Sequence, residues 1–332
     1  MHIPDGFING ATSLGAGVLA AGGLGAALRR GSRTLKDRQI PLAGLVAAFV
    51  FALQMLNFPV AAGTSGHLLG GALAAVLLGP SMAVVVVSVV VIVQALLFAD
   101  GGVSALGLNI LNMGLLTALV GWGAFRVSMA VLPKRTASVV GAAFGAAWFS
   151  VVVSSLGFVA EYALGGSGQA RIGTVLGAMA GVHSLIGIGE GVITGAIVAA
   201  VLAVRPDLVY GAQRYELATS RRLMPGRAAM GGFVAVGLIV ALGLVIFVAP
   251  LANSDPDGLE RVAEDRGFVS TARDTVTADS PLAGYGVAGV ENDRRGTVVA
   301  GLIGTLLVFT TGTGILVAVR RRRAHPASKT GP

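Results

Sequence analysis

Residues 81–99 read SMAVVVVSVVVIVQALLFA, a stretch that contains no charged side chain. About 20 apolar residues are needed for a helix to cross the hydrocarbon core of a bilayer, so this stretch predicts a membrane-spanning helix. The whole chain of 332 residues is 54% hydrophobic and only 12% charged. A soluble domain usually carries about a quarter charged residues. We therefore expect an all-α polytopic membrane protein.

Nine apolar stretches are predicted to form its helices. In chain order they cover residues 9–28, 40–58, 66–79, 81–99, 106–132, 137–160, 172–203, 229–251 and 297–319. The third is short, so its length leaves open whether it crosses fully or forms a tilted or partly re-entrant helix. The chain also contains 50 glycines, which predict helices that pack closely through small residues.

Two modules follow from the positions of these stretches. Residues 1–203 are predicted to form a seven-span module, and residues 229–332 a two-span C-terminal module. A basic segment, 204–228, is expected to link them on the cytoplasmic side. The C-terminal module contains a hydrophilic extracytoplasmic loop, 252–296, with nine acidic and five basic residues.

The positions of the basic residues predict the orientation. A signal peptide carries its positive charges before the apolar run, whereas here they follow the first span. Because basic loops face the cytoplasm, we expect the N-terminus outside and the C-terminus inside a bacterial or archaeal inner membrane. The basic residues of the expected cytoplasmic segments are Arg29, Arg30, Arg33, Lys36, Arg38, Lys134, Arg135, Arg205, Arg214, Arg221, Arg222, Arg227 and Arg320 to Arg323. The net charge of +8 thus reflects topology, and no nucleic-acid partner is expected.

The first residues, Met-His-Ile-Pro-Asp-Gly, predict a metal site. Bulky His2 is expected to protect the initiator methionine from removal, so that a free amine precedes an imidazole. That amine, the amide nitrogen of His2 and its imidazole nitrogen can close fused, nearly planar chelate rings on one metal. Planar nitrogen sets suit Ni²⁺ or Cu²⁺ best. Pro4 stiffens the chain directly after the chelate.

A fourth ligand is required, and the remaining histidines are candidates. His67 follows the Gly-rich turn 63–66 on the expected outer face, which favours a ligand over a histidine bonded to local backbone. His183 lies inside the seventh span, with Glu190 on the same helical face. Because ionisable groups are costly inside a membrane, this pair is expected to have a structural or gating role rather than to ligate the metal directly. His325 lies in the cytoplasmic tail and is set aside.

Other polar side chains lie near the outer ends of spans. Two pairs are spaced i, i+3, namely Gln54 with Asn57 and Asn109 with Asn112. Each pair is expected to project from one helical face. Two interpretations stay open, hydrogen bonding between helices or orientation of the metal ligands. Asp100 begins an outer loop, where helix capping and a role at the site are both compatible with the sequence.

Several chemistries are excluded by composition. The chain has no cysteine, so disulfides and thiolate metal sites are impossible, and a metal must use nitrogen or oxygen ligands. It also lacks the Gly-x-x-x-x-Gly-Lys-Ser/Thr phosphate loop, the HExxH pair and the Gly-x-Ser-x-Gly elbow. We therefore expect that the chain is not an enzyme and carries no organic cofactor.

Four segments resemble one known family. They are MHIPDGFI at 1–8, FALQMLNFPVAAGTSGHLLGGALAAVLLGP at 51–80, ADGGVSALGLNILNMG at 99–114 and HSLIGIGEGVIT at 183–194. The chain resembles the CbiM/NikM family, the substrate-binding membrane components of energy-coupling-factor (ECF) ABC transporters for cobalt and nickel. The C-terminal module resembles the PDGLE domain, through DPDGLERVAEDRGF at 255–268 and SPLAGYGV at 280–287.

This resemblance implies a function, ligands and partners. It implies capture of Co²⁺ or Ni²⁺ outside the cell and delivery to the cytoplasm, for cobalamin synthesis or for nickel enzymes. The implied ligands are the amine of Met1, the amide and imidazole nitrogens of His2 and the imidazole of His67. The implied partners are a transmembrane coupling subunit and cytoplasmic ATPase subunits, whose ATP hydrolysis releases the metal inside. For the PDGLE module, metal loading and insertion of the N-terminus both stay open.

Three other functions are weighed against transport by an ATP-driven complex. A passive or ion-gradient-driven metal channel or carrier needs a polar path through the bilayer, which only His183 and Glu190 offer. A metalloenzyme needs an open coordination position, and a metal sensor needs an output domain that the cytoplasmic segments lack. The choice between nickel and cobalt stays open. The basic segment from Arg214 to Arg227 and the small-residue helix faces are candidate coupling surfaces.

Overall fold

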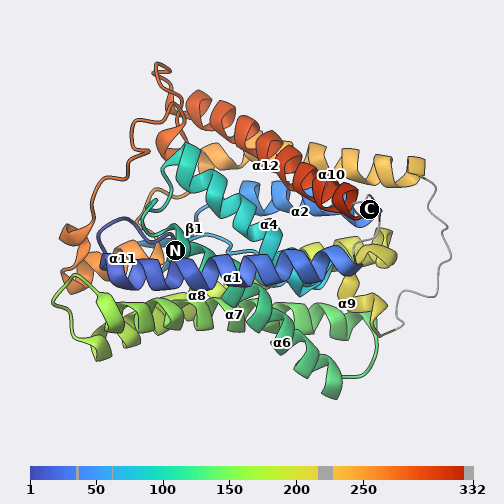
Figure 1. The fold of residues 1–332 in the computed structure, drawn as a ribbon, viewed down its shortest axis with the longest axis horizontal. Coiled ribbons are helices and arrows are strands. Elements are labelled where there is room, and N and C mark those ends of the chain that lie inside the picture. Colours follow the sequence, from blue (N-terminus) through green and yellow to red (C-terminus); the bar gives the residue numbers. More distant parts are fainter. Residues whose placement is uncertain (35–36, 62, 216–226, 325–332) are drawn as a thin grey trace, which may run out of the picture.

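The structure is a computed structural model that describes residues 1–34, 37–61, 63–215 and 227–324. Within these residues the chain is predominantly helical, as expected for an all-α membrane protein. Seven helices are long and apolar enough to cross a membrane, which confirms the predicted class. Figure 1 shows most of them running side by side along the longest axis of the molecule.

The N-terminal part contains most of the helices. Its elements are α1 (Gly10–Thr34), α2 (Gln39–Gln54), α3 (Gly71–Leu78), α4 (Pro80–Val93) with the π-helical η1 (Gln94–Phe98), α5 (Leu106–Asn109), the π-helical η2 (Ile110–Leu116), α6 (Thr117–Val131), α7 (Thr136–Gly165) and α8 (Ile172–Val204). A short antiparallel hairpin, β1 (Phe58–Ala61) and β2 (Thr64–Gly66), lies between α2 and α3. Two predicted spans are thus shorter than a full crossing helix, namely α2 with 16 residues and α3 with 8.

The short helix α3 explains the ambiguous third span. At 1.5 Å per residue it is only about 12 Å long. All eight of its residues are buried, and the four residues before it, 67–70, have irregular backbone. Such backbone is tolerated at membrane depth where protein covers it. The helix ends at Gly79, whose φ of 86° favours glycine, and Pro80 then starts α4.

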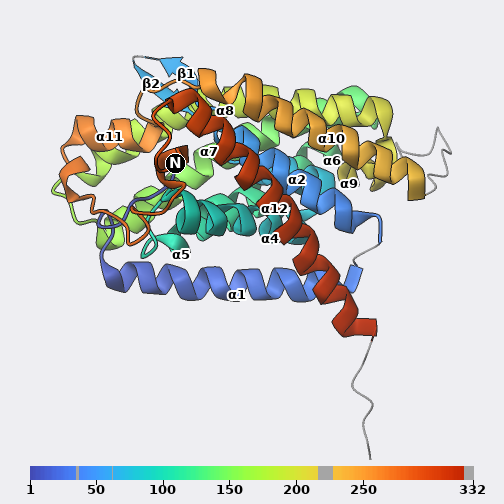
Figure 2. The same ribbon diagram turned by 90° about the horizontal axis from the view of Figure 1, so that it is seen from above.

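The C-terminal part packs on the same bundle. Its elements are α10 (Arg227–Phe247), α11 (Gly258–Arg266) and α12 (Asp293–Ala324), with short 3₁₀ turns η4 (Ala249–Leu251), η5 (Val269–Thr271) and η6 (Ala283–Tyr285). Figure 2 shows α12 crossing over α2. Close approach is possible because Gly44 on α2 faces α12, where an added Cβ would lie 2.9 Å from the carbonyl oxygen of Phe309.

Segments that the sequence assigns to one side of the membrane meet at one end of the molecule. Asp37 forms an ion pair with Arg320, and Arg38 lies 3.8 Å from Asp207, so three of the basic segments are in contact.

Between Leu208 and α10 only the short helix α9 (Tyr210–Gln213) and its end are described. Residues 216–226 of the expected linker, and His325, lie outside the described residues. The N-terminal segment, the hairpin and α11 gather at the other end (Figure 1).

Candidate metal site

The first nine residues run into the helical bundle rather than over its surface. The side chains of Met1 and Ile3 are only 3% and 0% exposed. Four main-chain hydrogen bonds hold the segment. Its carbonyls at Ile3, Asp5 and Phe7 accept from the N–H groups of Gly102 (2.9 Å), Arg273 (2.8 Å) and Ser167 (2.9 Å), respectively. The N–H of Asn9 donates to the Gly165 carbonyl at 2.7 Å. Because three separate loops supply these partners, the position of Met1 is set by tertiary structure.

Asn109 holds Ile3, the residue that follows the predicted ligands Met1 and His2. The main-chain N–H of Ile3 donates to Oδ1 of Asn109 at 2.7 Å, and Nδ2 of Asn109 donates to the Ile3 carbonyl at 3.1 Å. The asparagine side chain thus satisfies both main-chain groups of one residue. This contact orients the backbone that carries the amide nitrogen of His2.

The terminal amine of Met1 faces two side chains from distant parts of the chain. It donates to Nε2 of His67, and it lies 2.7 Å from Oδ2 of Asp257. The Nδ1 atom of His67 lies 3.0 Å from the main-chain oxygen of Leu68, so Nε2 is left to face the amine. The amine and this imidazole nitrogen are therefore adjacent, as two donors to one metal must be.

The imidazole of His2 completes the cluster. Its ring stacks on that of His67, with centroids 5.1 Å apart and planes at 21°. Its Nδ1 lies 3.1 Å from Oδ1 of Asp100, and its Nε2 lies 3.1 Å from Oε1 of Gln94. Burial is the main reason that the pKa of His2 is lowered to about 4. The ring is therefore neutral near pH 7, the form in which a histidine binds metals.

Asp257 brings a negative charge to the amine. Burial by itself would raise its pKa, but the terminal ammonium group and His67 hold the pKa of this carboxyl well below its ordinary value. Its Oδ1 also accepts hydrogen bonds from the N–H groups of Leu259 and Glu260, which caps the start of α11. The sequence analysis recognised the PDGLE string but gave no site role to Asp257, because only folding brings it to Met1.

The segment that carries His67 is fastened from two sides. The carboxylate of Glu190, which is fully buried on α8, accepts the N–H groups of Leu69 (2.7 Å) and Gly70 (3.0 Å). Nε2 of Gln54 donates to the Leu69 carbonyl at 2.9 Å. Glu190 thus contacts the main chain two residues beyond His67 rather than the cluster of nitrogen atoms itself.

His183 lies beside the cluster without a direct bond to it. Its Nδ1 lies 2.9 Å from the carbonyl oxygen of Met179, and its buried Nε2 has no partner among the described residues. It lines a cavity of about 10 Å³ together with Met1, His67 and Asp257, which is room for about one water molecule. No hydrogen bond joins His183 to Glu190 in the described part of the chain, so the two side chains have separate partners.

The remaining predicted polar residues lie farther from the cluster. Asn112 turns away, and its Nδ2 donates to Glu161 on α7 at 2.7 Å. Regular α-helical spacing would place Asn109 and Asn112 on one face. The π-helical element η2 begins directly after Asn109, so the two side chains point in different directions. The main-chain carbonyl of Asn57 accepts from Asn253 N–H at 2.8 Å, and Asn57 lines an outer cavity.

That outer cavity leads to the histidines and has a volume of about 340 Å³. Its lining includes His2, His67 and four carboxylates, Asp100, Asp255, Asp257 and Glu260. Tyr285 closes part of it and donates to Oδ2 of Asp100 at 2.6 Å. Acidic walls attract a cation by raising its local concentration. Tyr285 and Gln94, whose Nε2 donates to Tyr285 at 3.0 Å, are site residues that the sequence analysis missed.

A metal site at this cluster would use main-chain and terminal nitrogens as well as side chains. Among the described residues, no group of three or more His, Asp or Glu side chains has an arrangement that could hold a metal ion. The cluster instead offers the amine of Met1, the amide nitrogen of His2 and two imidazoles.

The chain matches two protein families. Residues 2–208, more than half of its length, match the family described as cobalt uptake substrate-specific transmembrane region, CbiM. The chain belongs to the CbiM family. Residues 231–321 match the PDGLE domain. The resemblance seen in the four sequence segments and in the PDGLE string is thereby confirmed.

Relatives of this CbiM-family chain include proteins with both modules. A protein of Archaeoglobus fulgidus, provisionally named as a fused nickel transport protein NikMN, is 32% identical over 94% of this chain and 97% of its own. The fused nickel transport protein NikMN of Rhodobacter capsulatus is 41% identical over 36% of this chain and 35% of its own. The cobalt transport protein CbiM of Sorangium cellulosum is 35% identical over 54% of this chain and 80% of its own.

The fold of the CbiM-family region is also similar to a solved structure. A crystal structure of a truncated transition metal transporter matches 61% of this chain and 99% of its own, with a TM-score of 0.55 and 28% identity. Together with the seven apolar helices, these relatives identify a multi-pass membrane protein of a metal-transport family.

Proposed function

We propose that this chain captures Ni²⁺ or Co²⁺ outside the cell and delivers it to the cytoplasm as the substrate-binding subunit of an ECF-type importer. The observation that carries this proposal is the buried contact between the Met1 amine and Nε2 of His67, beside the imidazole of His2. The metal is the transported substrate, and no organic cofactor is assigned. The proposed ligands are Met1, His2 and His67.

The proposed chelate predicts which contacts metal binding replaces. The amide nitrogen and Nδ1 of His2 can close a six-membered ring on the metal, so Nδ1 is the expected donor. In the structure this nitrogen faces Asp100, so metal binding is expected to displace that carboxylate. The amine must lose its proton to bind a metal, so the Asp257 carboxylate is expected to face a cationic metal site in place of an ammonium group.

The neighbouring polar residues are assigned positioning roles. Asn109 holds the backbone next to the His2 amide, and Glu190 holds the main chain next to His67. Such supporting contacts orient metal ligands, and their loss typically lowers metal affinity about 10- to 100-fold. His183, which lines the small cavity at the site, is assigned to the path by which the metal leaves. Asn57 at the outer cavity is assigned to the path of entry.

We assign the region 1–203 to metal binding, 204–228 to a cytoplasmic linker and 229–332 to the PDGLE module. The N-terminus is placed outside and the C-terminus in the cytoplasm, because basic residues gather at the end of the molecule away from Met1. ATP hydrolysis is assigned to separate ATPase subunits acting through a transmembrane coupling subunit, since this chain has no phosphate-binding loop.

The PDGLE module is proposed to secure the inserted N-terminus. Its loop contacts the N-terminal segment through Asp257 at the amine and through Arg273, whose N–H donates to the Asp5 carbonyl. The ring of Phe268 also packs against that of Phe7. It also contributes three carboxylates, Asp255, Asp257 and Glu260, to the outer cavity. A cation that approaches the ligands therefore passes residues from both modules.

A one-residue insertion tests the chelate directly. Adding one alanine between Met1 and His2 keeps every side chain but enlarges the chelate rings and moves the amine. We expect the purified chain to bind one Ni²⁺ or Co²⁺ ion, and the insertion variant to lose this binding. A matched insertion between Pro133 and Lys134, in an exposed turn far from the site, is expected to leave binding intact. Mass spectrometry of the N-terminus checks that Met1 carries a free amine.

Two outcomes oppose the proposal. Unchanged metal binding after the Met1–His2 insertion would remove the ligand assignment and direct attention to His183, Glu190 and the acidic outer cavity. Metal uptake into liposomes by this chain alone, without ATPase subunits, would instead support a passive or ion-gradient-driven channel or carrier. Circular dichroism of each variant separates a lost site from a lost fold.

A further inference from the structure

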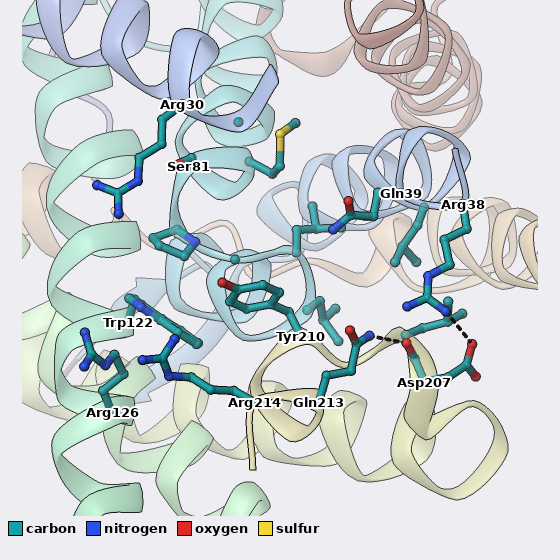
Figure 3. A pocket seen from close by; sticks show the side chains of 18 residues that line it. Arg30, Arg38, Gln39, Ser81, Trp122, Arg126, Asp207, Tyr210, Gln213 and Arg214 are labelled. Atoms are coloured by element: carbon teal, nitrogen blue, oxygen red, sulfur yellow. Dashed lines mark hydrogen bonds and ion pairs between the residues drawn. The ribbon is translucent and has the colours of Figure 1, made fainter. Parts of the chain in front are cut away.

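A separate cavity lies at the end of the molecule away from Met1. Its volume is about 530 Å³, and four arginines line it, namely Arg30, Arg38, Arg126 and Arg214. Figure 3 shows that they come from different elements, Arg30 from α1, Arg38 from the start of α2, Arg126 from α6 and Arg214 from the end of α9. Segments distant in sequence thus bring positive charge to one hollow.

Most of this charge is not neutralised by the protein. Arg38 lies 3.8 Å from Asp207, but that carboxylate is already bonded by Arg205 at 2.8 and 2.9 Å. Within the described part of the chain, no carboxylate lies at ion-pair distance from the other three, Arg30, Arg126 and Arg214. Like charges that converge in a recess focus a positive potential and attract an anion.

An adjoining cavity extends the same basic region. Its volume is about 580 Å³, and it shares Arg126 and Arg214 with the first while adding Lys134. The combined lining therefore has five cationic side chains and a single carboxylate, Asp207, among the described residues. An anion with more than one negatively charged or strongly accepting oxygen would suit this arrangement.

The chemistry of the lining favours phosphate on an amphipathic molecule. Guanidinium groups bind phosphate oxygens in pairs, with planar geometry that matches the anion. The cavity wall also carries Trp122 and Tyr210, whose ring centroids lie 5.2 Å apart, and apolar side chains that include Leu42, Leu77 and Met82. Tryptophan and tyrosine are enriched where membrane-spanning helices reach the lipid headgroups.

We propose that this basic cavity binds the phosphate of an anionic phospholipid headgroup. Basic pockets between helices on the cytoplasmic side are known to hold such headgroups. A recess between helix ends, with an apolar and aromatic wall, suits a headgroup joined to acyl chains better than an acidic patch on a protein partner. The proposal depends on membrane insertion of the chain and not on the metal site.

The test uses the purified full chain in a neutral detergent. Native mass spectrometry counts bound lipid as dioleoyl phosphatidylglycerol is added, with dioleoyl phosphatidylcholine and inorganic phosphate as separate arms. We expect retention of phosphatidylglycerol only. The variant Arg30→Gln, Arg126→Gln, Arg214→Gln is expected to bind it at least about tenfold more weakly, since charge-assisted hydrogen bonds are lost.

A charge-matched variant controls for nonspecific attraction. Arg29→Gln, Arg33→Gln, Arg135→Gln removes the same charge from exposed arginines outside the cavity lining and is expected to retain the lipid. If the cavity triple variant fails to fold, as judged by circular dichroism, the single variant Arg30→Gln replaces it, with Arg29→Gln as its control.

Four results would overturn the proposal. They are equal losses in the cavity and control variants, equal retention of phosphatidylcholine, binding of inorganic phosphate as tight as that of the lipid, and unchanged lipid binding in the cavity variant. If the cavity variant keeps its lipid but no longer co-purifies with a membrane coupling subunit, the site belongs to an acidic protein partner instead.

Discussion

The carboxylate oxygen Oδ2 of Asp257 lies 2.7 Å from the amino nitrogen of Met1, although 256 positions separate the two residues in sequence. The same side chain caps the first turn of α11 through the N–H groups of Leu259 and Glu260. One carboxylate thus joins the start of the PDGLE helix to the first residue of the chain. The two modules meet at the proposed metal ligands themselves.

Replacing Asp257 by asparagine is predicted to weaken metal binding by about 10- to 100-fold, the range typical of groups that support metal ligands. Asparagine is nearly isosteric and also caps helices, so α11 is expected to stay formed. The lost feature is the negative charge beside a buried cationic site. Isothermal titration with Ni²⁺ or Co²⁺ measures the effect.

The neighbouring carboxylate provides the control for this change. Asp255 lines the same outer cavity, but it has no ion pair with the amine, so Asp255→Asn is expected to bind metal nearly as tightly as the wild type. Equal losses in the two variants would indicate that the general negative charge of the cavity matters, and that the Asp257–Met1 contact has no special role.

The two asparagines that flank the start of η2 are predicted to differ in effect. Asn109→Ala removes the clamp on Ile3 and is expected to lower metal affinity about 10- to 100-fold. Asn112→Ala leaves the buried carboxyl of Glu161 without its partner and is expected to lower the free energy of unfolding by about 1–3 kcal/mol, with metal affinity unchanged. Metal titration and thermal unfolding of both variants test this, and a shared loss of affinity would contradict it.

Gly6 is predicted to tolerate no side chain. Its φ is 90°, and an added Cβ would overlap the main-chain oxygen of Thr271 in the PDGLE loop. Gly6→Ala is therefore expected to loosen the N-terminal segment from that loop, with faster proteolysis of the loop and weaker metal binding. Gly15→Ala, at an open position on α1, is the control and is expected to be neutral or slightly stabilising. Equal protection of the loop in both variants would sink the argument.

Metal affinity is predicted to rise with pH, because the amine and the amide nitrogen must lose protons to bind the metal. Protonation of Asp257 does not account for this trend in mild acid. Its folded-state pKa is well below its ordinary value, so the stability it contributes is present above the unfolded pKa and is lost only as pH falls through the lower folded pKa. Calorimetry in buffers of different ionisation enthalpy measures the protons released, and binding without proton release would exclude a deprotonated amide donor.

Much of the fold was predictable because membrane-spanning helices are encoded locally. The long apolar stretches, such as 81–99, match helices, since a helix in lipid must satisfy its own backbone groups. The third span was ambiguous for a physical reason as well. Its eight-residue helix depends on burial by its neighbours, which local hydropathy does not report.

The sequence by itself determined the class of the protein and its long apolar helices, and it predicted an amine, an amide and an imidazole within the first two residues. Those features are set by covalent adjacency and by apolar length. Only the tertiary structure decided that His67 faces the amine and that Asp257 neutralises it. It also decided that Asn109, rather than Asn112, holds the main chain of Ile3. These relationships depend on how distant loops pack together and on where η2 interrupts the regular helical turn. Neither can be obtained from the spacing of residues along the chain.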